Sequence, residues 1–91
     1  MMREGTGFRI LGGMSPATID ALDELSAREI EILAYMAEGY TNPAISSELW
    51  LSLKTVEAHI RSIFIKLCLP AGGRHDRRVI AVLAYLHRYA A

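Results

Sequence analysis

The chain has 91 residues, a formal net charge of zero and 52% hydrophobic residues, which suits one small domain with a modest core and is too short for two. Its single cysteine excludes an internal disulfide, and its three scattered histidines form no zinc-ligand spacing. No apolar run reaches the roughly 18 residues of a membrane span, and the N-terminus lacks the apolar core of a signal peptide. These features predict a cytoplasmic protein without a metal or other cofactor.

The zero net charge conceals an asymmetry along the chain. Residues 1–51 contain three basic and eight acidic residues, a balance of −5, whereas residues 52–91 contain seven basic and two acidic residues, a balance of +5. A block of one sign within a domain can mark a surface for nucleic acid. Two ordinarily solvated faces would have the same composition.

Residues 1–20 are expected to form an arm or linker with a short helix. The first 14 residues contain four of the seven glycines and no periodic pattern. Ser15 followed by Pro16 is a preferred helix start, because the serine can cap the helix and proline tolerates its first position. This helix would end near Leu22 as an appendage of the main domain, which is assigned to residues 21–91.

The first strong helix follows in LSAREIEILAYMAEG. Ser26 and Glu29 have the three-residue spacing of a capping box, and Gly39 supplies a C-terminal stop. Apolar residues recur at helical spacing between these limits and predict one buried stripe. They are Leu25, Ile30, Ile32, Leu33, Met36 and Ala37.

A short helix is predicted next, over residues 43–49. Thr41 or Asn42 would cap it, and Pro43 lies in its first turn, where the missing amide hydrogen costs nothing. Because about two helical turns are not stable alone, this helix must dock on a neighbour.

A longer helix is predicted over residues 53–67, capped by Ser52. The turn before it contains Trp50 and Leu51, and Trp50 is expected to pack against the protein. The buried stripe comprises Val56, Ile60, Ile63, Phe64 and Leu67, and the opposite, cationic side comprises Lys54, Glu57, Ala58, Arg61, Ser62 and Ile65. Two helices joined by a tight turn, the second with a cationic outer face, have the geometry with which a helix-turn-helix enters the major groove.

A fourth helix is predicted over residues 76–89, with Asp76 or His75 as its cap. It has two adjacent apolar stripes, Val79, Leu83 and Leu86 on one and Val82, Tyr85 and Tyr89 on the other. A single packing face does not need both. Either one stripe closes the core and the other meets a second copy of the protein, or a small core buries both. Arg77 and Arg78 either extend a phosphate-binding surface or cap the preceding loop.

Several motifs of the chain resemble the LuxR-type (GerE/NarL-like) helix-turn-helix domain, which is found as the output domain of bacterial response regulators. They are LSAREIEIL, AEGYTN, AISSELWLS, KTVEAHIRSIFIKL and DRRVIAVLAYL, and they cover residues 25–86. The resemblance implies an all-α, four-helix domain preceded by a short arm or helix, with residues 53–67 as recognition helix. It also implies a homodimer that binds double-stranded DNA at a two-part site in the nucleoid and regulates transcription, with RNA polymerase as a further partner.

The expected site residues form three groups: the resemblance implies the first two by position, and the second apolar stripe of residues 76–89 supplies the third. The expected base contacts are Glu57, Ala58 and Arg61. The expected phosphate contacts are Asn42, Lys54, Thr55, His59 and Lys66, although a packed histidine is an equal interpretation of His59. The expected dimer contacts are Val82, Tyr85 and Tyr89.

Four positions depart from the family pattern. Pro43 and Ala44 replace a Lys-Glu pair, which removes a potential phosphate contact. Glu57 stands where many members have lysine, and its carboxylate repels phosphates but can accept a hydrogen bond from the amino group of cytosine. Cys68 replaces a glycine at a left-handed helix end, at a cost of about 1 kcal/mol unless the helix ends differently.

Two other functions fit the same sequence. One is a protein-interaction module that recruits or modulates polymerase or another regulator without specific DNA binding, and the other is a sigma-factor-like promoter-recognition domain. The fourth helix after Leu67 favours the LuxR type over the sigma type. An enzyme is not expected, because so small a helical domain leaves little room for a substrate pocket around Cys68 and His75.

Overall fold

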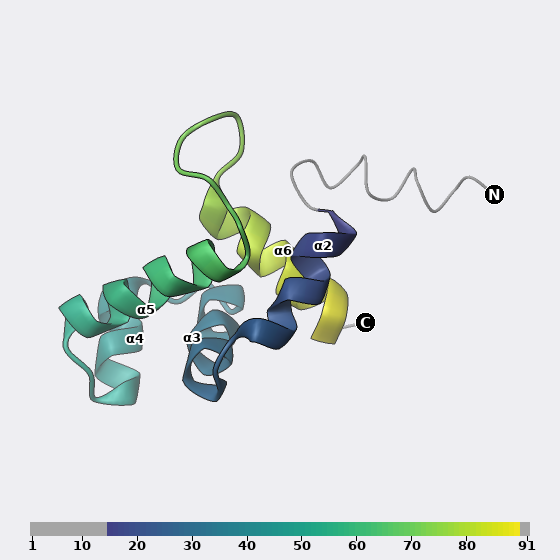
Figure 1. Cartoon of the computed structure of the whole chain (residues 1–91). Coiled ribbons are helices and arrows are strands. Elements are labelled where there is room, and N and C mark those ends of the chain that lie inside the picture. The colour runs from purple at the N-terminus through teal and green to yellow at the C-terminus, as the bar shows by residue number, and fades with distance from the viewer. Residues whose placement is uncertain (1–14, 90–91) are drawn as a thin grey trace.

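The computed structural model describes residues 15–89, and every regular element in this range is helical. The elements are α2 (Pro16–Asp20), a 3₁₀ turn (Ala21–Glu24), α3 (Ala27–Ala37), α4 (Asn42–Leu49), α5 (Leu53–Lys66) and α6 (Arg77–Tyr89) (Figure 1). The predicted all-α fold is confirmed. Residues 1–14 of the expected arm lie outside the described residues.

Helix starts follow the caps that the sequence predicts. In each case a side-chain oxygen accepts a backbone N–H of the first turn, which would otherwise lack a partner. The pairs are Ser15 with Thr18 (3.3 Å), Ser26 with Glu29 (3.1 Å), Thr41 with Ala44 (3.3 Å), Ser52 with Thr55 (3.0 Å) and Asp76 with Arg78 (2.8 Å). Local sequence therefore sets where every helix begins.

Helices α3 and α5 end in the same backbone motif. After α3, Gly39 has φ +90°, and after α5, Cys68 has φ +59°. In both cases two successive amides donate back to the last turn, at 3.0 and 3.1 Å after α3 and at 2.9 and 3.0 Å after α5, as in a Schellman motif. Cys68 thus keeps the left-handed conformation that glycine favours.

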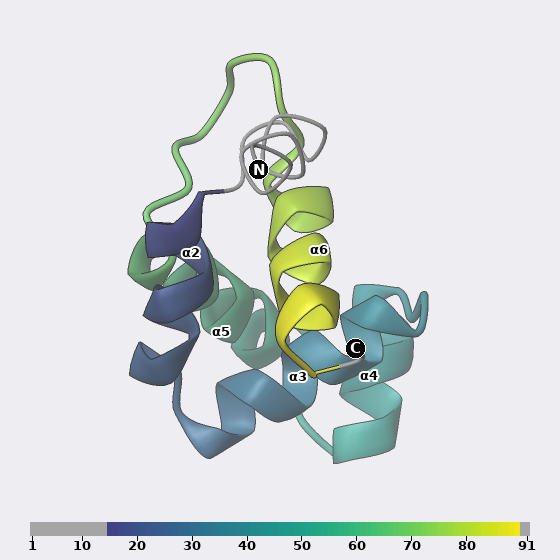
Figure 2. The ribbon, with the colours of Figure 1, turned by 90° about the vertical axis from the view of Figure 1, so that its right-hand side faces the viewer.

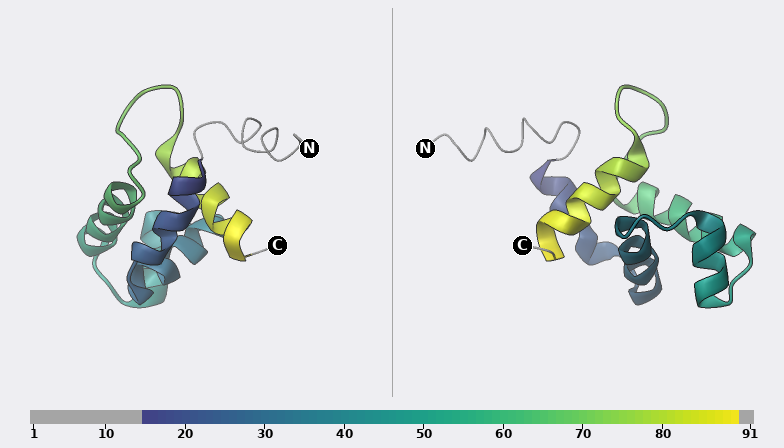
Figure 3. Two further views of the ribbon diagram at one scale, coloured as in Figure 1. Left: turned by 45° about the vertical axis from the view of Figure 1, so that its right-hand side comes forward. Right: turned by 180° about the vertical axis from the view of Figure 1, so that it is seen from behind.

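The core lies between α3, α5 and α6, and α4 docks on α5. The buried apolar residues are Leu22, Ile32, Leu33, Met36, Ile45, Val56, Ile60, Ile63, Phe64, Leu67, Ile80, Ala81 and Ala84. The stripe predicted on α5 is confirmed in full. Ile45, which is completely buried, supplies the docking that the short α4 needs. Helices α4 and α5 form one end of the molecule, and α2 and the end of α6 lie at the other (Figure 3).

The core-facing side of α6 differs from the prediction. Ile80, Ala81 and Ala84 are buried, whereas Val79 and Leu86 are 52% and 38% exposed. α6 makes its most extensive contact with α3, and the small alanines let the two backbones approach closely. Of the two predicted stripes, Val82, Leu83 and Tyr85 pack against the core as partly buried side chains, so neither stripe alone closes it.

Helix α2 packs against α6 (Figure 2). Arg88 near the end of α6 donates to the carbonyl oxygen of Ile19 at 2.8 Å and forms an ion pair with Asp23 at 2.5 Å. Leu22 is almost completely buried in the same region. The segment before α3 is thus integrated into the core of the domain.

Candidate nucleic-acid interface

Helices α4 and α5 are joined by a turn of three residues that Ser46 holds in place. Trp50 in this turn has a left-handed conformation, with φ +57°, and its amide donates to the carbonyl oxygen of Ser46. The amide of Leu51 donates to the same oxygen at 3.1 Å, and the hydroxyl of Ser46 donates to the carbonyl oxygen of Leu51. Three hydrogen bonds to one residue therefore fix the angle between the two helices.

The indole of Trp50 is 93% exposed. The prediction that it packs against the protein is wrong. Its left-handed backbone directs the side chain outward, and its neighbours Leu49 and Leu51 make the apolar contacts instead. The corner of the helix pair thus presents a large aromatic ring to solvent.

The outer face of α5 presents most of the residues that the sequence assigns to DNA. Lys54, Thr55, Glu57, Ala58 and Arg61 are exposed. Within residues 15–89, no ion pair engages a charged group of this face. Its charges are therefore available to a partner.

Thr55 at the start of α5 has a defined hydroxyl geometry. The hydroxyl of Ser52 donates to the hydroxyl oxygen of Thr55 at 2.9 Å, and accepts the backbone N–H of Thr55. The hydrogen of the Thr55 hydroxyl consequently remains available as a donor. His59, one turn further along, is half-buried at the flank of the helix.

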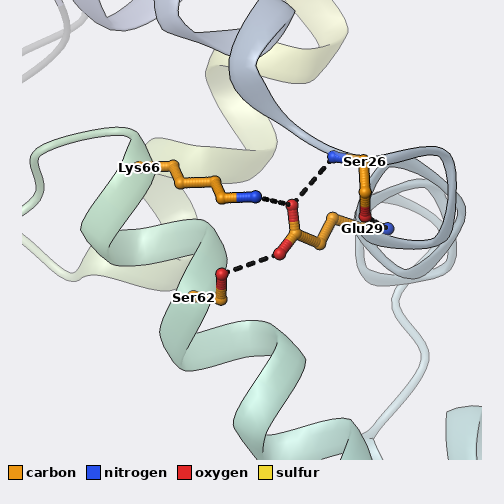
Figure 4. A network of polar contacts seen from close by, with 4 residues as sticks. All are labelled: Ser26, Glu29, Ser62 and Lys66. Carbon is orange, nitrogen blue, oxygen red and sulfur yellow. Dashed lines mark hydrogen bonds and ion pairs between the residues drawn. The ribbon is translucent and has the colours of Figure 1, made fainter.

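Two polar residues of α5 bind a carboxylate of α3 (Figure 4). The hydroxyl of Ser62 donates to Oε2 of Glu29 at 2.7 Å, and Nζ of Lys66 donates to Oε1 at 2.9 Å. Oε1 also accepts the backbone N–H of Ser26 at 2.9 Å. Placing Ser62 on the outer face was therefore wrong. Lys66 lies about 18 Å along the helix from Lys54, and its ammonium is already bound within the domain.

Glu29 is charged although only 4% of its surface is exposed. Burial alone would raise the pKa of this carboxyl, but the Lys66 ammonium and the donors of Ser26 and Ser62 lower the pKa to about 2. No buried side-chain nitrogen or oxygen within residues 15–89 lacks a hydrogen-bond partner. The network locks α3 to α5 and so fixes the outer face of α5 relative to the core.

Asn42 and Arg78 join the start of α4 to the start of α6. Nη1 of Arg78 donates to Oδ1 of Asn42 at 2.8 Å, and Nη2 donates to the carbonyl oxygen of Tyr40 at 3.0 Å. The amide oxygen of Asn42 is thus occupied, and its amide nitrogen remains as a donor. The sequence left open whether Arg78 extends a phosphate-binding surface or caps the loop before α6. In the structure its guanidinium binds Asn42 and the carbonyl oxygen of Tyr40.

Two helices at a three-residue turn, with an uncovered polar face on the second, define a helix-turn-helix of the nucleic-acid-binding class. The chain matches the family of bacterial regulatory proteins called the luxR family over residues 23–84. It belongs to this family, whose helix-turn-helix is the DNA-binding domain of transcription regulators. The family is not a family of enzymes. The resemblance seen in the sequence is thereby confirmed.

Among similar proteins, the transcriptional regulatory protein LiaR of Bacillus subtilis is 44% identical over 66 residues, which are 72% of this chain and 28% of LiaR. The oxygen regulatory protein NreC of Staphylococcus aureus is 50% identical over 54 residues, or 59% of this chain and 25% of NreC. The chain therefore spans about a quarter of the length of these relatives. No solved structure matches it significantly. None of the helices in residues 15–89 has the length and hydrophobicity to cross a membrane.

Proposed function

We propose that this domain binds specific sequences of double-stranded DNA, with α5 in the major groove, as the output domain of a bacterial transcription regulator. The observation that carries the proposal is the exposed and unpaired guanidinium of Arg61 on the uncovered face of α5. A helix about 10–12 Å wide fills a major groove about 12 Å wide, so this face would meet base edges. The names of the relatives, both regulatory proteins, support the same role.

Three adjacent side chains would read bases. Arg61 suits the O6 and N7 acceptors of guanine, and the Ala58 methyl suits the methyl of thymine. Glu57 can accept from the amino group of cytosine, while its charge weakens contact with phosphates. The combination would lower nonspecific affinity and increase selectivity.

Phosphate contacts would fix the register of the helix on the duplex. Lys54 and Thr55 lie in the first turn of α5, where the helix dipole and the free Thr55 hydroxyl hydrogen favour a phosphate oxygen. The flanking His59 imidazole and the amide nitrogen of Asn42 would add further donors. The ammonium of Lys66 is already bound by Glu29, so Lys66 would act mainly by holding α5 on α3.

A homodimer through α6 would place two copies of α5 on a two-part site. Val79, Leu86 and Tyr89 are exposed, and together with the partly buried Val82 they have spacings of three, four and three, as in a coiled-coil seam. The exposure of the three outer residues on a folded domain supports an apolar contact with a second copy. Tyr85 would hold the Tyr89 ring in position, because the two ring centroids lie 5.0 Å apart. Bound in this way, the regulator would act on RNA polymerase at a nearby promoter.

Selection from random duplexes tests the base-reading role directly. Arg61→Ala should weaken binding to the selected sequence by about 1–3 kcal/mol with less effect on random DNA, whereas Lys54→Ala should weaken both alike. Arg28→Ala, which removes an exposed cation of α3, controls for net charge. Equal losses on both DNAs for Arg61→Ala would contradict base reading. A chain that binds no duplex at any salt concentration would instead be a protein-interaction module, with the exposed Trp50 as its first candidate contact.

A further inference from the structure

A hollow beside the base-reading face brings together three separate helices. It has a volume of about 210 Å³ and is lined by Asn42 of α4, Glu57, Ile60, Arg61 and Phe64 of α5, and Arg77 of α6. Two guanidinium groups outweigh the single carboxylate at this place. The hollow is therefore a cationic site at the edge of the proposed interface.

Arg77 and Arg78, adjacent in sequence, have different surroundings. Arg78 is engaged by two hydrogen bonds to the α3–α4 connection, at 2.8 and 3.0 Å. The guanidinium carbon of Arg77 instead lies 4.7 Å from the centroid of the Phe64 ring. Throughout the described part of the chain, no hydrogen bond or ion pair occupies the nitrogen donors of Arg77. The ring supports the guanidinium and leaves its donors for a ligand.

The N-terminus of α6 does not supply an alternative anion site here. Oδ1 of Asp76 already accepts the amides of Arg78 and Val79, at 2.8 and 3.4 Å. The negative cap also lowers the attraction of this helix end for an anion. Recognition of an anion in the hollow would therefore fall to the Arg77 side chain.

We infer that Arg77 is a DNA phosphate contact that the sequence left undecided, and that the hollow receives a backbone phosphate flanking the bases read by Arg61. The inference rests on the proposed DNA-binding function. Phosphate rows run along both edges of the major groove, so a helix that fills the groove brings its flanks against them. The hollow lies on such a flank, and a guanidinium binds phosphate with two parallel hydrogen bonds. Arg77 would also offset the repulsion between Glu57 and the same phosphate row.

The test is the salt dependence of binding by the full chain to a fluorescein-labelled duplex of mixed sequence, measured by anisotropy over a series of potassium chloride concentrations. Arg77→Ala should lower the slope of log affinity against log salt by about 0.9 per bound chain, or about eightfold in affinity at about 0.1 M salt. Arg77→Lys keeps the charge and should keep the slope. Arg28→Ala, on α3 and outside the hollow, should leave the slope unchanged.

Loss of the stacking on Phe64 is a separate effect that thermal unfolding detects. If Arg77→Ala unfolds, Arg77→Gln, which keeps part of the side-chain length without the charge, takes its place in the same titration. An unchanged slope in the folded neutral variant would overturn the inference and leave the proposed function standing, provided that the wild type shows salt-dependent binding. A wild type without any salt-dependent binding would overturn both.

Discussion

Replacing Cys68 with glycine should raise the free energy of unfolding. The residue has φ +59° at the end of α5 and its side chain is exposed, so the substitution removes no apolar packing. The left-handed conformation costs a non-glycine residue about 1–2 kcal/mol. Glycine also makes the unfolded chain more flexible, which stabilises the unfolded state and lowers the gain by about 0.4–1 kcal/mol. The net gain should be about 1 kcal/mol, which for a domain of this size corresponds to a rise in Tm of about 4–8 °C.

Urea and thermal denaturation followed by far-ultraviolet circular dichroism, under reducing conditions, measure this gain. Cys68→Ala is the matched variant, because it removes the sulfur and keeps the Cβ atom in the same conformation. Gly39→Ala is the reciprocal one, since its φ is +90° and no other group lies within 4 Å of the added Cβ. The free energy of unfolding of Gly39→Ala should be about 1 kcal/mol lower than that of the wild type. If Cys68→Ala gained as much as Cys68→Gly, the sulfur and not the backbone would be the cause, and the argument would fail.

Two further predictions concern the Glu29 network and the α6 seam. Glu29→Gln should destabilise the domain by about 1–3 kcal/mol at neutral pH in urea denaturation, allowing for solvent screening of the partly exposed Lys66. Because the pKa of Glu29 is lowered from 4.5 to about 2, its contribution is complete above about pH 5 and is lost as the pH falls toward 2; an equal acid dependence in wild type and variant would contradict this role. Leu86→Asp should abolish cooperative binding to a two-part site and leave binding to one half-site unchanged, as gel-shift titration can show, and cooperativity that survived would refute the seam.

The starts and ends of the helices could be predicted because they depend on a few neighbouring residues. Ser26 and Glu29 form their capping box within one turn, and Ser52 caps α5 in the same local way. The buried stripe of α5 was also predictable, since large apolar residues repeat along it without interruption. Interactions between residues close in sequence therefore determine these parts of the fold.

The errors arose where a side chain depends on a distant helix. Helical periodicity alone assigns Ser62 to the outer face of α5, but α3 brings Glu29 to within 2.7 Å of its hydroxyl. The buried face of α6 was misjudged because Ala81 and Ala84 carry little hydrophobic signal of their own. Their importance comes from the close approach of α3, which no local pattern encodes. The same reason explains why the sequence does not distinguish Arg77 from Arg78, whose partners lie on other helices.

The exposed turn between α4 and α5 also gives the domain a built-in optical probe. Trp50 is the single tryptophan of the chain, and its indole is already in water in the folded state. Its emission should therefore change little on unfolding, so a fluorescence melt of this protein would be nearly silent. The ring precedes the proposed phosphate contacts Lys54 and Thr55 by only a few residues, so nucleotides that replaced the water around it would quench its emission by stacking. A change in emission on addition of DNA would then report contact of this turn with the duplex, without any attached label.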